Sequence, residues 1–156
     1  IDGDTIQRNI DYYDQRTSHG STLSRIVNAW VLARSDRERS WEFFKGALLS
    51  DVTDIQGGTT PEGIHLGAMA GTVDLVQRGF TGIETREDTL WLDPAIPDEL
   101  GELRFEIRYR GHVLDFHLTP DQLSVTTRPS EAQPIRVGIR DRVIEVPAGT
   151  TETVPL

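Results

Sequence analysis

The sequence predicts an α+β chain, with helices in its first half and a small antiparallel β-sandwich in its second half. Apolar residues recur at three- and four-residue steps up to about Phe80, and at every second position from about Thr89 onward. With 156 residues, 37% of them hydrophobic and 26% charged, the chain reads as globular and suffices for one ordinary domain or two small ones. The change of period falls near residues 80–88, and we divide the chain into 1–82 and 83–156.

Two helices with a very short connection are predicted after residue 20. The first, residues 21–34, has one apolar face, formed by Leu23, Ile26, Val27, Trp30 and Ala33. The second starts with a capping box, in which Ser35 accepts a hydrogen bond from the backbone while Glu38 reaches back. Its buried stripe is formed by Trp41, Phe44, Ala47 and Leu48. This arrangement is typical of a helical hairpin, with Trp30 and Trp41 in the core.

A third helix is predicted to begin near Pro61, with Thr60 as its N-cap and Pro61 as its first helical residue. Gly67 and Gly71 are poor helix formers, and small residues four positions apart indicate the close approach of another backbone or of a ligand. Tight helix packing is favoured over a cofactor loop, because no strand precedes these glycines, as a dinucleotide-binding motif requires.

Six short segments with alternating apolar and polar residues, separated by turn residues, predict the strands. They are residues 89–94, 103–111, 112–119, 122–129, 135–141 and 142–149. In the second segment, one face would carry Leu103, Phe105, Ile107 and Tyr109, and the other Arg104, Glu106, Arg108 and Arg110. Several short strands at near-regular spacing are typical of a compact antiparallel sandwich.

Composition and charge argue against several classes of function. The formal net charge is −9 without a basic cluster, which disfavours nucleic acid and anionic membrane surfaces as partners. No apolar run approaches the roughly 20 residues that cross a membrane, and the absence of cysteine excludes disulfides and thiolate chemistry. We expect a cytoplasmic protein.

The four histidines are scattered without the spacing of metal ligands, so no metal site is predicted. His112 and His117 lie in the strand half, and we expect them to be ordinary surface or edge residues.

Two loops rich in hydroxyl groups come directly before predicted helices. The first contains His19, Gly20, Ser21 and Thr22, and the second contains paired glycines, paired threonines and His65. A helix N-terminus carries free backbone N–H groups and a partial positive charge, so two such loops could converge on one oxyanion such as phosphate. The competing interpretation, weighed evenly, is that these hydroxyls are helix caps and the histidine a packing residue.

Glu62 stands at the predicted start of the third helix. A first-turn acidic residue usually stabilises the helix dipole, and this structural role is favoured. The functional alternative is a general base that activates water.

The stretches YYDQRTSHGSTLS, residues 12–24, and GGTTPEGIHLGAMAGT, residues 57–72, resemble glycoside hydrolase family 65. This family comprises maltose, trehalose and kojibiose phosphorylases with some related hydrolases. The resemblance covers nearly the whole chain but only the C-terminal end of the family's length, and the chain begins in mid-pattern without a methionine. We therefore expect a piece of a larger protein.

The resemblance implies that residues 1–82 are the last helices of an (α/α)6 barrel and that residues 83–156 are the C-terminal β-sandwich. The barrel helices would pack against the remainder of the same polypeptide, and a homodimer is possible. In isolation the chain should then expose an apolar face, contributed by Leu23, Ile26, Trp30, Trp41, Phe44 and Leu48.

The resemblance also implies an inverting phosphorylase that uses inorganic phosphate and an α-linked glucosyl disaccharide to form β-glucose 1-phosphate. Its phosphate ligands would be His19, Gly20, Ser21, Thr22 and His65, with Thr22 in place of the family's more usual serine. The family's general acid lies upstream, so no catalytic residue is expected in this chain, which alone should be inactive. No metal or organic cofactor is implied.

Two alternatives stay open. The first is an inverting hydrolase of the trehalose or kojibiose type, in which Glu62 or an upstream acid would be the base. The second is a non-catalytic packing module.

Overall fold

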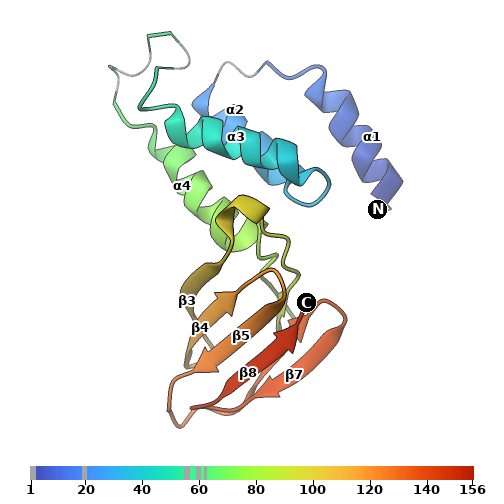
Figure 1. Cartoon of the computed structure of the whole chain (residues 1–156), viewed down its shortest axis with the longest axis vertical. Helices are drawn as coiled ribbons and strands as arrows, with labels where there is room; N and C mark the ends of the chain where they lie inside the picture. The colour runs from blue at the N-terminus through green and yellow to red at the C-terminus, as the bar shows by residue number, and fades with distance from the viewer. Residues whose placement is uncertain (1–2, 19–20, 55–56, 59–60, 62) are drawn as a thin grey trace. The chain divides into compact units, whose positions relative to one another are not determined.

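A computed structural model describes residues 3–18, 21–54, 57–58, 61 and 63–156 (Figure 1). The chain divides into two compact units, Ile1–Phe80 and Thr81–Leu156. The first unit is helical and the second consists of strands with one short 3-10 helix, Asp98–Leu100, which confirms the predicted fold class. In the described part of the chain, no helix is both long enough and apolar enough to cross a membrane.

The helical unit contains α1 (Gly3–Asp14), α2 (Thr22–Leu32), α3 (Arg37–Leu49) and α4 (Leu66–Asp74). Helix α4 continues into a π-helical segment, Leu75–Gly79. The predicted first and second helices correspond to α2 and α3, whereas α1 was not singled out by the sequence pattern.

Helices α2 and α3 form an antiparallel hairpin (Figure 1). The buried hydroxyl of Ser40, early in α3, donates a hydrogen bond of 2.7 Å to the carbonyl oxygen of Ala29, late in α2. Arg25, early in α2, lies against Gly46, late in α3. The end of α3 is therefore next to the start of α2.

Helices α2 and α4 pack closely and run in the same direction. A Cβ atom at Gly67 would meet Leu23 Cδ1 at 4.0 Å, and one at Gly71 would meet Ile26 Cγ1 at 2.9 Å. Because both contacts follow chain order on each helix, the N-terminal ends of α2 and α4 are neighbours. The prediction of tight packing is confirmed at Gly71, whereas Gly67 makes only an ordinary contact.

Two predicted helix starts are wrong. Asp36, not Ser35, is the N-cap of α3, and its side chain accepts a hydrogen bond of 3.1 Å from the backbone N–H of Arg39. A carboxylate caps a helix as well as a hydroxyl does, so Asp36 displaces its neighbour.

The third helix begins at Leu66, with His65 as N-cap, and not near Pro61. Gly63 has φ of +99°, a left-handed conformation that a right-handed α-helix does not contain, so the helix begins after it. The predicted N-cap, Thr60, lies outside the described residues.

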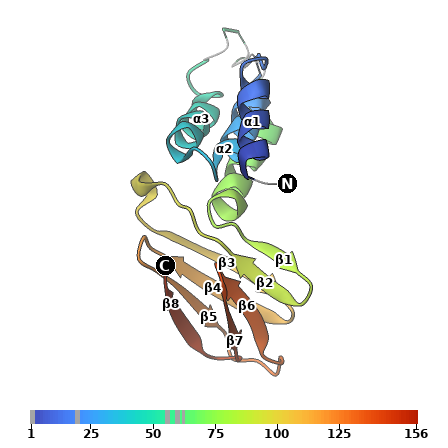
Figure 2. The same cartoon turned by 90° about the vertical axis from the view of Figure 1, so that its right-hand side faces the viewer.

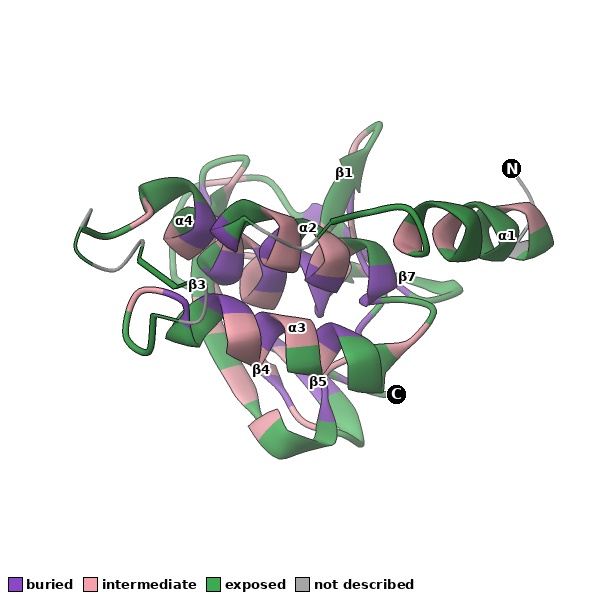
Figure 3. Ribbon diagram, turned by 90° about the horizontal axis from the view of Figure 1, so that it is seen from above, coloured by how far each residue is buried: buried purple, intermediate pink, exposed green. Residues whose placement is uncertain are grey.

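The apolar face of the helical unit differs from the prediction (Figure 3). Ile26 and Phe44 are buried, because Ile26 lies against Gly71 of α4 and the ring of Phe44 lies against that of Phe80. Leu23 and Leu48 are exposed, as expected. Trp30 and Trp41 are only half-buried, not core residues. Further exposed apolar side chains on α1 and α2 are Ile6, Tyr12, Tyr13, Val27 and Val31.

The second unit is a sandwich of two four-stranded sheets, ordered β1-β2-β6-β7 and β3-β4-β5-β8 (Figure 2). The strands are β1 (Glu84–Arg86), β2 (Thr89–Leu92), β3 (Leu103–Tyr109), β4 (His112–Leu118), β5 (Gln122–Thr127), β6 (Ile135–Ile139), β7 (Arg142–Val146) and β8 (Thr151–Pro155). All six predicted strands are present, and β1 and β8 were missed because they carry little apolar alternation.

One strand pair departs from the antiparallel expectation. Strands β2 and β6 are parallel, and in their register Trp91 stands opposite Gly138. The indole of Trp91 occupies the space that a Cβ at Gly138 would need. The pairing therefore depends on a glycine at this position.

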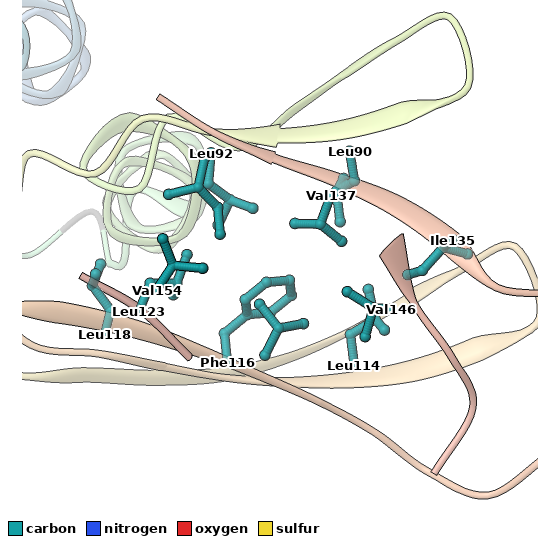
Figure 4. Packing of buried hydrophobic residues seen from close by; sticks show 12 residues of the cluster. Leu90, Leu92, Leu114, Phe116, Leu118, Leu123, Ile135, Val137, Val146 and Val154 are labelled. Atoms are coloured by element: carbon teal, nitrogen blue, oxygen red, sulfur yellow. The ribbon is translucent and has the colours of Figure 1, made fainter. Parts of the chain in front are cut away.

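The sandwich core is formed by the inward-facing residues of both sheets (Figure 4). Strand β4 alternates strictly between buried and half-buried positions, and β3 turns its four apolar residues inward and its arginines outward, as predicted. The cluster contains Leu90, Leu92, Leu114, Phe116, Leu118, Leu123, Val125, Ile135, Val137, Ile139, Val146 and Val154.

His112 is buried, so the prediction of a surface or edge position is wrong for this residue. It is the first residue on the inward face of β4, and its Nε2 lies 2.8 Å from the carbonyl oxygen of Gln133. Because a carbonyl only accepts, Nε2 carries the hydrogen. His117 faces outward and contacts Glu102, as expected for a surface residue.

Candidate functional site

Ser21 caps the start of α2. Its backbone is extended, with φ −123° and ψ 142°, and its Oγ accepts a hydrogen bond of 3.3 Å from the N–H of Leu23. The hydroxyl of Ser24 donates to the Ser21 carbonyl oxygen at 2.8 Å. Ser21 is exposed, whereas Thr22 is buried in the first turn. His19 and Gly20 lie outside the described residues.

His65 caps the start of α4, but its side chain makes no capping bond. Instead, the carboxylate of Asp51 binds both the backbone and the ring of His65. The Oδ2 of Asp51 accepts from the backbone N–H of His65 at 2.8 Å, and its Oδ1 lies 2.5 Å from the ring Nδ1. The Asp51 side chain is 7% exposed and that of His65 is 29% exposed. Both carboxylate oxygens are therefore committed to one residue.

A second carboxylate, that of Asp54, accepts hydrogen bonds from the backbone at Gly58, between α3 and α4. The N–H of Gly58 donates to both oxygens of Asp54, at 2.9 and 3.0 Å. Gly58 has φ of +120°, which only glycine adopts readily. The backbone amide of Gly58, one of the paired glycines in the second loop, therefore already has a hydrogen-bond acceptor. Thr59, Thr60 and Glu62 lie outside the described residues.

Ser21 and His65 occupy the same end of the helical unit. Helices α2 and α4 are parallel with neighbouring N-termini, and α3 is antiparallel, so that Asp51, just past its end, is also at this end. Two positive helix-dipole ends, a serine hydroxyl and an imidazole thus share one region. Such a region suits a tetrahedral oxyanion. Sequence reasoning missed Asp51, since only its bond to His65, 14 residues away, distinguishes it from other loop acids.

The imidazole of His65 holds the pKa of Asp51 below its ordinary value of 3.8, first through the side-chain hydrogen bond and second through the His65 backbone N–H. Both contacts stabilise the ionised carboxylate. Among the described residues, no cluster of three or more histidine, aspartate and glutamate side chains could hold a metal ion.

Acid is expected to loosen the start of α4. Since the folded-state pKa of Asp51 is lowered, the stability it contributes is present above about pH 4 and is lost as the pH falls through that lowered pKa. Asp51→Asn should therefore be less stable than the wild type at neutral pH, and the two should converge in acid. Thermal unfolding between pH 7 and pH 2 measures this.

The wild type must be compared with Asp51→Asn, because two other carboxyl groups also have a lowered pKa and also lose stabilising contacts in acid. Arg136 lowers the pKa of Asp88, and His117 lowers that of Glu102. A stability difference between wild type and Asp51→Asn that stays constant down to pH 2 would contradict the assignment to Asp51.

Two protein-family models, both of the same family, match this chain. The model described as the glycosyl hydrolase family 65 central catalytic domain matches residues 1–74, and that family's C-terminal domain matches residues 83–146. The chain belongs to glycosyl hydrolase family 65.

Relatives agree with this assignment. An uncharacterized glycosyl hydrolase of Mycobacterium tuberculosis (strain ATCC 25618 / H37Rv) is 47% identical over 146 residues, which are 94% of this chain and 11% of that protein. The trehalose 6-phosphate phosphorylase of Lactococcus lactis subsp. lactis (strain IL1403) is 39% identical over 122 residues, 78% of this chain and 16% of that protein. The α,α-trehalose phosphorylase of Thermoanaerobacter brockii is 30% identical over 148 residues, 94% of this chain and 19% of that protein.

A solved structure, named as a candidate kojibiose phosphorylase from the human microbiome, matches the fold. Its TM-score is 0.84 at 22% identity, over 100% of this chain and 20% of that chain. The chain thus spans between about a tenth and a fifth of the length of the proteins it matches.

Proposed function

We propose that this chain contributes the C-terminal part of an inverting phosphorylase of α-linked glucosyl disaccharides. The whole protein uses inorganic phosphate and releases β-glucose 1-phosphate. The observation that carries the proposal is the pairing of two helix N-termini at one end of the helical unit, one capped by Ser21 and the other by His65. The phosphorylase names of several relatives support it.

In this proposal the phosphate is held by the loop before α2 and the start of α4. Ser21 supplies an exposed hydroxyl. Thr22, whose side chain is buried, supplies its backbone N–H group. His19 and Gly20 complete the first loop, and His65 supplies its ring. Backbone N–H groups and neutral hydroxyls bind a phosphate dianion best where a helix N-terminus adds its positive potential.

Residues 1–82 would be the last helices of an (α/α)6 barrel and residues 83–156 the C-terminal β-sandwich. The two compact units and the two family models support this division. The exposed apolar side chains of α1 and α2 would then be covered by the remainder of the polypeptide, because their exposure has an energetic cost in water.

The chemistry is a single displacement with inversion. A phosphate oxygen attacks the anomeric carbon from the face opposite the leaving group, the bond from this carbon to the glycosidic oxygen breaks, and a carboxylic acid protonates that oxygen. The α-linkage thereby becomes a β-phosphate. This acid belongs to the barrel upstream of residue 1, so the 156-residue chain alone is inactive and supplies part of the phosphate site.

Removing either ligand side chain is expected to weaken the use of phosphate selectively. In the full-length enzyme, Ser21→Ala and His65→Ala should each cost about 1–3 kcal/mol, the range for a hydrogen bond to a charged group. This corresponds to a rise in the KM for phosphate of roughly 5- to 150-fold. The KM for the disaccharide should change little. The measurement is the initial rate against phosphate concentration at saturating disaccharide.

Matched controls are Ser35→Ala, in the turn between α2 and α3, and His117→Ala, on the outer face of the sandwich. Both should keep the wild-type dependence on phosphate. If Ser21→Ala and His65→Ala also keep it, these residues are helix caps only. Cleavage that proceeds equally well without phosphate would instead favour the inverting hydrolase, for which Glu62 is the candidate base in this chain.

A further inference from the structure

We propose that Asp51 is a positioning residue for phosphate binding, which orients the imidazole of His65 and balances its charge. The inference rests on the proposed function, since it assigns a role to a residue that holds a phosphate ligand. Asp51 does not itself contact phosphate, and its action is through His65.

The geometry supports more than a helix cap. A cap needs one acceptor for the backbone N–H, and Oδ2 of Asp51 fulfils this at 2.8 Å. The second oxygen binds the ring Nδ1 at 2.5 Å, which ties the imidazole to the same carboxylate. Backbone and ring of His65 are thus fixed together, so the ring has little freedom to rotate.

The bond to Asp51 also determines which ring nitrogen is left for a ligand. An ionised carboxylate only accepts hydrogen bonds, so Nδ1 of His65 must carry a hydrogen. Within the described part of the chain, Nε2 makes no hydrogen bond, and the side chain is partly exposed. Nε2 is therefore the ring atom that remains for an anion.

A phosphate oxygen without a hydrogen can only accept a hydrogen bond, so an imidazole that bonds to Asp51 and to such an oxygen at the same time carries hydrogens on both nitrogens. Its positive charge is then shared between two anions, with the buried carboxylate on one side and the phosphate on the other. Hydrogen bonds with a charged donor are roughly twice as strong as neutral ones. Asp51 thus holds the His65 ring in position and places a negative charge beside it.

The test is Asp51→Asn in the full-length enzyme. The asparagine oxygen can still accept from the His65 backbone, but the amide NH2 group would face Nδ1 and cannot accept its hydrogen. The KM for phosphate should rise about ten-fold, as a charge-assisted hydrogen bond becomes a neutral one. The KM for the disaccharide should stay within about two-fold, because the sugar is held elsewhere.

A matched control is Asp54→Asn, which removes a carboxylate from the same connection, where Asp54 binds the backbone of Gly58 and not His65. Its KM for phosphate should remain that of the wild type. Asp51→Asn in the His65→Ala background should have no further effect on this KM, because Asp51 acts through the ring.

The outcomes separate the two proposals. If His65→Ala raises the KM for phosphate and Asp51→Asn only lowers the melting temperature, Asp51 is a cap and the inference is overturned while the proposed function stands. If His65→Ala leaves this KM unchanged, the proposed phosphate role of His65 fails first. Should Asp51→Asn not fold, Asp51→Glu keeps the charge but displaces it, and an unchanged KM in that variant would also overturn the inference.

Discussion

Phe116→Ala is expected to reduce the free energy of unfolding by about 3–5 kcal/mol, the usual cost of emptying a buried aromatic position. Phe116 lies at the centre of the sandwich core, on the inward face of β4 (Figure 4). Its ring stacks on Phe105 of the neighbouring strand, with centroids 4.9 Å apart and an interplanar angle of 13°. Alanine would remove this contact and leave a cavity between the two sheets.

Urea unfolding followed by circular dichroism measures this loss. The matched control is Val143→Ala on β7, where the valine residue is 43% exposed. That variant should stay within about 0.5 kcal/mol of the wild type, as most exposed substitutions do. Equal stability losses in the two variants would mean that Phe116 is not central to the core.

Gly71→Val is expected to destabilise the helical unit by about 2–3 kcal/mol, because it overpacks the contact between α2 and α4. The new Cβ would meet Cγ1 of Ile26 at 2.9 Å and its Cγ2 at 3.1 Å. These atoms belong to a branched, buried side chain that cannot swing away without disturbing α2. The displacement would also separate the two helix starts, so phosphate use in the full-length enzyme should weaken.

Gly67→Val is the matched control in the same helix. A Cβ at Gly67 meets only Leu23 Cδ1, at an ordinary contact distance of 4.0 Å. Valine is also a slightly better helix former than glycine, so this variant should be as stable as the wild type within about 0.5 kcal/mol. If both variants unfold at the same urea concentration, α2 and α4 do not pack in the way described.

The sequence determined the two-part organisation of this protein, because hydrophobic periodicity reports which face of an element is buried. Strand β3 alternates apolar and charged residues, and its structure follows that pattern residue by residue. Helix α2 was recognised from its apolar spacing, and Ser21 is its N-cap in the structure. Each of these features depends on residues close together in the chain.

The tertiary structure decided which groups face each other. The sequence predicted Ser35 as the cap of α3, but Asp36 has this role in the structure, since both side chains can accept the same hydrogen bond. It also missed that His112, which looks like a residue at a hairpin end, is buried on the inward face of β4, with its ring bonded to Gln133.

The difference between local patterns and tertiary contacts also explains how much of the candidate site could be predicted. Ser21 and His65 could be selected from the sequence because hydroxyl and imidazole groups before helices are a local signal. The parallel packing of α2 and α4 depends on glycines, and the orientation of His65 depends on the carboxylate of Asp51. The role of these residues becomes visible only when segments distant in the sequence are in contact. Hydrophobic periodicity is a property of one segment of the chain, whereas a long-range hydrogen bond depends on two segments that are brought together by the fold.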